Sequence, residues 1–109
     1  MKIFVDIDET IAHYDGVVRK YQNAQPIHQN IEKVNRMYDS GHTITMWTAR
    51  GTETGIDHTE LTKKQLSDWG VRYHFLKFGK PSYDLFIDDR NLNATYHWTD
   101  SNVSKIIGE

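Results

Sequence analysis

The chain has 109 residues, which is the size of one ordinary domain. Its hydrophobic share of 38%, with 12% aromatic residues, is enough for one packed core and argues against disorder. The formal net charge of -2 excludes the basic excess of a duplex-binding protein, and the absence of cysteine excludes disulfides, thiolate zinc sites and cysteine nucleophiles. No apolar run is long enough for a membrane span, and carboxylates follow Met1 too soon for a secretory signal, so we expect a cytoplasmic protein without membrane association.

The first half of the chain alternates strand and helix patterns. Residues 2–7 form a β-branched and aromatic run that predicts a strand. Residues 11–20 carry the turn dipeptide Asp15-Gly16 between apolar residues, which predicts a small hairpin. Pro26 suits the first turn of a helix, whose apolar residues recur at helical spacing until Gly41.

The second half continues the alternation. Residues 43–47 predict a second strand, and a capping box at Asp57 predicts the start of a helix that ends at Gly70. Residues 71–78 and 83–87 predict a third and a fourth strand, whereas the stretch after them has no clear pattern. We therefore expect one domain over the whole chain, with the α/β class and a Rossmann-like, mostly parallel sheet flanked by helices.

In such a sheet, ligands bind beyond the carboxyl ends of the strands. Polar residues directly follow each of the predicted strands. In chain order they are Asp6 and Asp8, Thr48 and Arg50, Lys77 and Lys80, and Asp88 and Asp89.

Aspartate is twice as frequent as glutamate, 10 against 5, and half of the aspartates lie in two short segments. Carboxylates crowded at neighbouring strand ends repel one another, and a hard cation such as Mg²⁺ offsets that repulsion. Solvated turns or helix caps are the plainer interpretation, but they do not account for the Thr48 and Lys80 between the two acidic pairs. A hydroxyl and an ammonium can hold phosphoryl oxygens while an aspartate attacks phosphorus. A second carboxylate two residues further along points to the same side and can protonate the leaving oxygen.

These segments resemble the signatures of the haloacid dehalogenase superfamily. Residues 2–10 are similar to its first signature, an apolar strand followed by Asp-x-Asp-x-Thr, and residues 43–48 resemble the second, an apolar strand that ends in Thr or Ser. Lys80 followed by residues 84–89 resembles the third and fourth. The order and spacing agree over residues 1 to about 90.

The resemblance implies a role for each matching residue. Asp6 would be the nucleophile that forms an aspartyl-phosphate, and Asp8 the general acid and then the base for the attacking water. Thr48 and Lys80 would bind the phosphoryl group. Mg²⁺ would be held by Asp6, the backbone carbonyl of Asp8, and the pair Asp88 and Asp89, with Asp88 as the preferred direct ligand.

The hairpin at 11–20 resembles the small flap that the family has beside its site. The length of the chain leaves no room for a cap domain, so we expect an open site. The Gly79-Lys80-Pro81 step is similar to that of small capless members found with polysaccharide or sugar-nucleotide synthesis genes. Glu9 occupies a position where many members carry Gly.

Other polar residues are open to two interpretations. Arg50 either holds a second anionic group of the substrate or pairs with an acid such as Glu53. His13 in the flap is the one histidine placed to meet a substrate. Lys77 is a rival of Lys80, which we favour because Gly79 and Pro81 fix its backbone.

The expected function is a Mg²⁺-dependent phosphomonoesterase for a small phosphorylated metabolite, such as a sugar phosphate. An open site also suits a homo-oligomer that covers it, or a large substrate such as a nucleic-acid end or a phosphoprotein. A receiver-like phosphoacceptor switch has the same layout, but its phosphorylated Asp would take the place of Thr48. A plain cation-binding domain does not explain Thr48 and Lys80.

Overall fold

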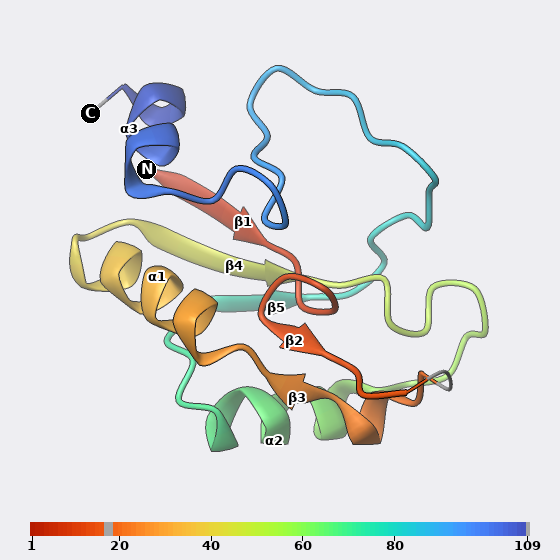
Figure 1. The fold of residues 1–109 in the computed structure, drawn as a ribbon. Helices are drawn as coiled ribbons and strands as arrows, with labels where there is room; N and C mark the ends of the chain where they lie inside the picture. The colour runs from red at the N-terminus through yellow and green to blue at the C-terminus, as the bar shows by residue number, and fades with distance from the viewer. Residues whose placement is uncertain (17–18, 109) are drawn as a thin grey trace.

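A parallel sheet of three strands forms the centre of the protein in a computed structural model that describes residues 1–16 and 19–108 (Figure 1). The strands lie in the order β1 (Lys2–Val5), β4 (Thr43–Trp47) and β5 (Phe75–Lys77). All three are parallel, so their carboxyl ends meet at one edge. This is the edge where ligands bind in open α/β sheets.

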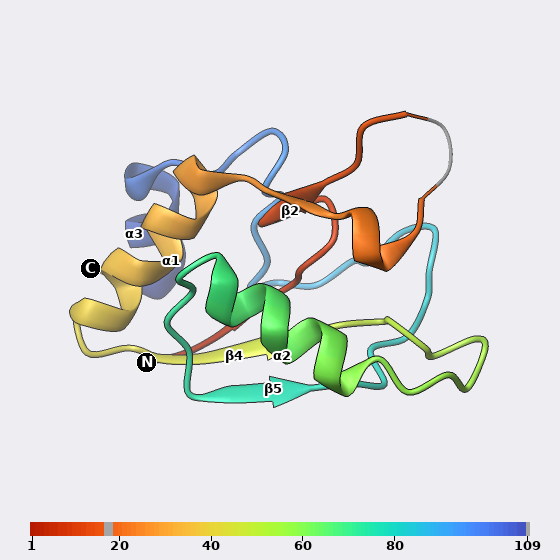
Figure 2. The same ribbon diagram turned by 90° about the horizontal axis from the view of Figure 1, so that it is seen from below.

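The helices α1 (His28–Asp39) and α2 (Thr59–Asp68) lie on the same face of the sheet, and α3 (Asp100–Ile107) lies beside α1 (Figures 1 and 2). Buried apolar residues of the strands, the loop after β1, the helices α1 and α2 and the segments next to them form the core. They are Val5, Ile7, Ile11, Ala12, Ala24, Ile31, Val34, Ile44, Met46, Leu66 and Val71. In the described ranges, no helix has the length and apolar character that a membrane crossing requires.

A second, two-stranded sheet pairs β2 (Ala12–His13) with β3 (Gln25–Pro26) in antiparallel orientation. The hairpin predicted over 11–20 expects the partner of β2 directly after the turn at Asp15-Gly16, whereas the observed partner of β2 is β3. Val17 and Val18, which follow that turn, lie outside the described residues. The backbone N–H of Ile27 donates to the carbonyl of Ile11, so the residue directly before α1 is bonded to the residue directly before β2. A short 3-10 helix, η1 (Tyr21–Asn23), precedes β3.

The predicted helices are confirmed with small shifts at their starts. Pro26 belongs to β3, and α1 begins two residues later. The Asp57 carboxylate accepts from the backbone N–H of Thr59 at 2.9 Å, one residue earlier than a capping box requires. Gly41 follows α1 with φ 96°, a left-handed conformation that glycine adopts without strain.

The predicted fourth strand is wrong. Residues 83–87 carry no strand and lie in the long connection between β5 and α3, where Leu85 is 74% and Ile87 86% exposed (Figure 1). A strand is stable only when its backbone pairs with a neighbour, and in the described structure β4 alone pairs with β1. The apolar pattern of this segment is therefore not sufficient to make it a strand. The C-terminal stretch forms α3, which Thr99 caps by accepting from the N–H of Asn102.

Candidate active site

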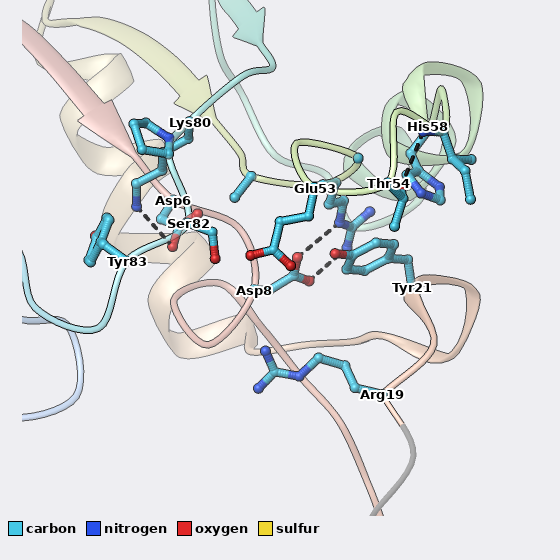
Figure 3. A pocket seen from close by; sticks show the side chains of 15 residues that line it. Asp6, Asp8, Arg19, Tyr21, Glu53, Thr54, His58, Lys80, Ser82 and Tyr83 are labelled. Carbon is cyan, nitrogen blue, oxygen red and sulfur yellow. Dashed lines mark hydrogen bonds and ion pairs between the residues drawn. The ribbon is translucent and has the colours of Figure 1, made fainter.

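A pocket of about 550 Å³ lies in the loops that follow the strands (Figure 3). Four residues expected from the sequence line it, namely Asp6, Asp8, Arg50 and Lys80. The parallel strands explain this meeting, since β1, β4 and β5 deliver their following residues to one edge. Lys77, the rival of Lys80, is exposed and does not line the pocket.

Asp6 and Lys80 face each other in the pocket. Lys80 Nζ lies 3.2 Å from Asp6 Oδ2, and the Lys80 side chain is only 13% exposed. The other carboxylate oxygen of Asp6 accepts from the backbone N–H of Ile7 at 2.9 Å. Burial raises the pKa of Asp6 although Lys80 opposes this. Burial lowers the pKa of Lys80, but the attraction of Asp6 and hydrogen bonds to Tyr83 and Asp6 outweigh it, so that the pKa of Lys80 is raised.

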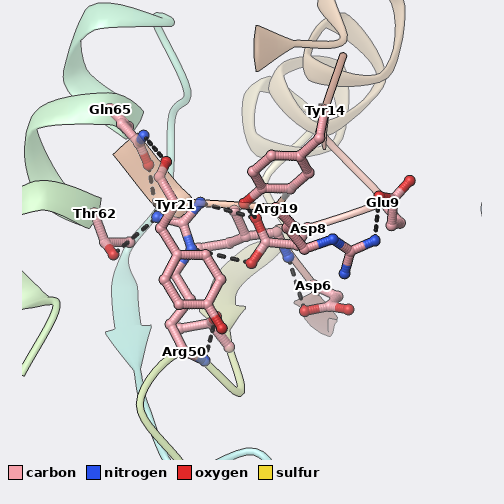
Figure 4. A network of polar contacts seen from close by, with 11 residues as sticks. Asp6, Asp8, Glu9, Tyr14, Arg19, Tyr21, Arg50, Thr62 and Gln65 are labelled. Carbon is pink, nitrogen blue, oxygen red and sulfur yellow. Dashed lines mark hydrogen bonds and ion pairs between the residues drawn. The ribbon is translucent and has the colours of Figure 1, made fainter. Parts of the chain in front are cut away.

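Asp8 is held by three hydrogen bonds from two side chains (Figure 4). Arg50 donates from Nε to Oδ2 at 3.0 Å and from Nη2 to Oδ1 at 2.9 Å. The Tyr14 hydroxyl donates to Oδ1 at 2.6 Å. Burial and this bond to the Asp8 carboxylate raise the pKa of Tyr14. Both carboxylate oxygens of Asp8 are therefore in use.

Of the two roles considered from the sequence, Arg50 takes the second, an ion pair with an acid, although that acid is Asp8 rather than Glu53. Its side chain is fully buried, and its guanidinium is bonded within the protein. Burial lowers the pKa of Arg50, but its bonds to Asp8 outweigh this and raise it. Glu53 instead lines the pocket, with its carboxylate directed into it (Figure 3).

Thr48 is buried and does not line the pocket. It is 1% exposed, and its hydroxyl accepts from the backbone N–H of Arg50 at 3.1 Å. Its backbone N–H donates to the carbonyl of Lys77, and its carbonyl accepts from the N–H of Lys80 at 3.1 Å. The structure thus places Thr48 where it holds the backbone of Lys80, not where its hydroxyl meets a phosphoryl group.

Asp88 and Asp89 do not join Asp6. Both are exposed in the connection before α3, and neither lines the pocket. Within residues 1–16 and 19–108, no three carboxylate or imidazole groups lie close enough to hold a metal ion. Because Asp88 and Asp89 lie outside the pocket that holds Asp6, the arrangement does not fit the magnesium site that the sequence predicts, and no chemical step goes through a metal.

The loop after β1 is tightly turned, because the carbonyl of Ile7 accepts from the N–H groups of Thr10, Ile11 and Ala12. Glu9 at its tip has φ 63°, the left-handed region that favours glycine. The Glu9 side chain pairs with Arg19.

Several pocket residues were not anticipated from the sequence. They include Arg19, Tyr21, Glu53, Thr54, His58, Ser82 and Tyr83. Ser82 and Tyr83 come two and three residues after Lys80, a proximity that the sequence already showed. His13, the histidine that the sequence placed in the flap, does not line the pocket. Its Nδ1 lies 3.5 Å from Asp15 Oδ1.

Comparison with known proteins gives a structural neighbour. A crystal structure of a target protein from Vibrio cholerae is similar over 98% of this chain and 96% of its own, with a TM-score of 0.81 at 23% sequence identity. This likeness supports a shared α/β fold. No family model matches the chain, and no curated protein matches its sequence.

Proposed function

We propose that this chain is a phosphatase related to the haloacid dehalogenase superfamily and hydrolyses phosphate monoesters through a phosphorylated Asp6. The observation that carries the proposal is the meeting of Asp6 and Lys80, 3.2 Å apart in a pocket at the carboxyl end of the sheet. The order of the four signature-like segments in the sequence agrees with it. Phosphoryl transfer asks mainly for positioning and neutralisation of charge, and this pair offers a nucleophile beside a cation.

The reaction takes two steps. A carboxylate oxygen of Asp6 bonds to phosphorus while the ester P–O bond breaks, and the leaving oxygen takes a proton from Asp8. A water oxygen then bonds to phosphorus and gives its proton to Asp8, while the bond to Asp6 breaks and inorganic phosphate leaves. Lys80 balances the charge on the phosphoryl oxygens in both steps.

The pocket suits a small phosphorylated metabolite. Hydroxyl groups of Thr54, Ser82 and Tyr83 and the Glu53 carboxylate line it beyond Asp6, and such groups bind the hydroxyls of a sugar. A sugar phosphate is therefore our preferred substrate class, ahead of a nucleic-acid end.

Turnover of p-nitrophenyl phosphate by the wild type and by Asp6→Asn tests the proposal. We expect wild-type hydrolysis and none with the variant, whose fold circular dichroism checks. Equal turnover by both would refute the role of Asp6. A receiver-like switch would instead retain label from acetyl phosphate and release it slowly.

A further inference from the structure

All three nitrogens of the Arg50 guanidinium donate hydrogen bonds within the protein interior. Besides its two bonds to Asp8, its Nη1 donates to Thr62 Oγ1 at 3.1 Å and to Gln65 Oε1 at 2.6 Å (Figure 4). Both partners lie on α2 and are themselves buried. The helix thus fixes the plane of the guanidinium, and the guanidinium in turn fixes the plane of the Asp8 carboxylate.

The same cluster anchors the segment between β2 and β3 at two points. Tyr14, near its start, donates to Asp8. The ring of Tyr21, near its end, lies 4.9 Å from the Arg50 guanidinium carbon, and the carbonyl of Tyr21 accepts from Gln65 Nε2 at 2.7 Å. Asp8 therefore sits between the sheet edge and the segment beside the pocket.

Stability alone is a weak reason for such an arrangement. Removing an ion pair from water costs free energy, and packed apolar residues of similar volume are often equally stabilising or better. What an apolar replacement does not supply is a fixed orientation of a carboxylate at a pocket. Orientation matters in the second step of the proposed reaction, where Asp8 must take a proton from the water that attacks phosphorus.

We propose that Arg50 and Tyr14 are positioning residues that hold the Asp8 carboxylate for dephosphorylation of Asp6. The inference rests on the proposed function and adds two residues to it. In this step the water O–H bond breaks, its proton goes to Asp8, the new O–P bond forms, and the P–O bond to Asp6 returns its electron pair to that carboxylate. Neither Arg50 nor Tyr14 gains or loses a proton.

Tyr14→Phe removes the hydroxyl that donates to Asp8 and keeps the aromatic ring. With p-nitrophenyl phosphate, whose leaving group needs no proton, we expect a kcat about 10-fold lower, part of the roughly 10²–10⁴ that positioned proton transfer contributes. KM falls with kcat and kcat/KM stays unchanged, because the first step is spared and phosphorylated enzyme accumulates. Intact-mass spectrometry of the quenched steady state measures that accumulation.

Arg50→Lys keeps the charge but loses the two-point bond, and we expect the same signature with a larger fall in kcat. Thr62→Val removes one support of Arg50 and gives a smaller fall, so the inference remains testable where Arg50→Lys does not fold. Tyr96→Phe, at an exposed position, is the matched control and behaves as wild type.

The outcomes separate the two proposals. Wild-type enzyme that hydrolyses no phosphate ester contradicts the proposed function itself. If the wild type is active and Tyr14→Phe has the same kcat and KM, the positioning role is overturned and the proposed function is not. A loss of kcat/KM without accumulated phosphoenzyme also overturns the positioning role, since that is the result of a merely structural role.

Discussion

Asp8 and Arg50 are 42 residues apart in the sequence and form a two-point ion pair whose cationic side chain is fully buried. The pair joins the loop after β1 to the loop after β4. It lies beside the Asp6–Lys80 contact, and with Glu53 and Arg19 the pocket is lined by three carboxylates and three cations. A phosphoryl group that enters this pocket adds negative charge, which makes the cations decisive for binding.

Replacing Lys80 by Met tests that charge balance. The change removes the ammonium that faces Asp6, and we expect kcat/KM for p-nitrophenyl phosphate to fall about 10²–10³-fold, the range for loss of one electrostatic stabiliser. Lys77→Met is the control, because Lys77 is exposed and lies outside the pocket. Steady-state kinetics of both variants decide the matter, and equal effects would remove Lys80 from the mechanism.

Gly51→Ala tests the shape of the loop after β4. Gly51 has φ 81°, and an added Cβ would lie 2.2 Å from the carbonyl oxygen of Ile56, so the loop must move. Gly55→Ala has a similar φ of 75° but open space around it, and we expect it to cost about 1 kcal/mol of unfolding free energy. Urea denaturation should show a clearly larger loss for Gly51→Ala. If the two variants lose the same amount, the close approach to Ile56 does not constrain the loop.

The contribution of Asp57, at the N-terminus of α2, to the stability of the fold should depend on pH. Hydrogen bonds from the hydroxyl and the N–H of Thr59 lower the pKa of Asp57. A carboxyl whose pKa is lower in the folded state stabilises the fold above its unfolded pKa and loses that contribution as pH falls through the folded value. Thermal unfolding should therefore show Asp57→Asn less stable than wild type at pH 7, with the difference closing below about pH 4. A difference that persists at low pH would contradict this assignment.

Chelation tests the magnesium that the sequence predicts. In the structure Lys80 faces Asp6, and Asp88 and Asp89 lie outside the pocket, so we expect hydrolysis to continue in EDTA. Asp88→Asn and Asp89→Asn should likewise keep the wild-type kcat/KM, because both side chains are exposed. Loss of hydrolysis in EDTA and its recovery with Mg²⁺ would contradict this expectation and support the magnesium site predicted from the sequence.

The sequence predicted the sheet well where local and tertiary signals agree. Residues 43–47 form a buried strand flanked by two others, and this strand is confirmed residue for residue. Residues 83–87 have a similarly apolar pattern, but a strand also depends on a partner, which no local pattern specifies. The same limit applies to β2, whose partner lies at Gln25–Pro26 rather than in the adjacent turn.

The residues of the candidate site fall into two similar groups, those that the sequence predicts and those that only the tertiary packing determines. Residues that follow strands, such as Asp6 and Lys80, are brought together by the parallel topology and were found from the sequence. The partner of Arg50 was not found, since the sequence offered Glu53 as an example of a pairing acid, and only the packing of α2 through Thr62 and Gln65 directs the guanidinium to Asp8. The burial of Thr48 likewise could not be predicted from the sequence. The sequence predicts that the Thr48 hydroxyl binds a phosphoryl group, whereas the structure buries this side chain.

The central claim is that Asp6 becomes phosphorylated, and borohydride trapping tests it most directly. Enzyme quenched during turnover of p-nitrophenyl phosphate is treated with borohydride, which reduces an acyl phosphate to an alcohol, and the peptide that contains Asp6 is sequenced by mass spectrometry. We predict homoserine at position 6 only when substrate is present, and unmodified aspartate at position 8. Hydrolysis that proceeds with aspartate intact at position 6 would contradict the account.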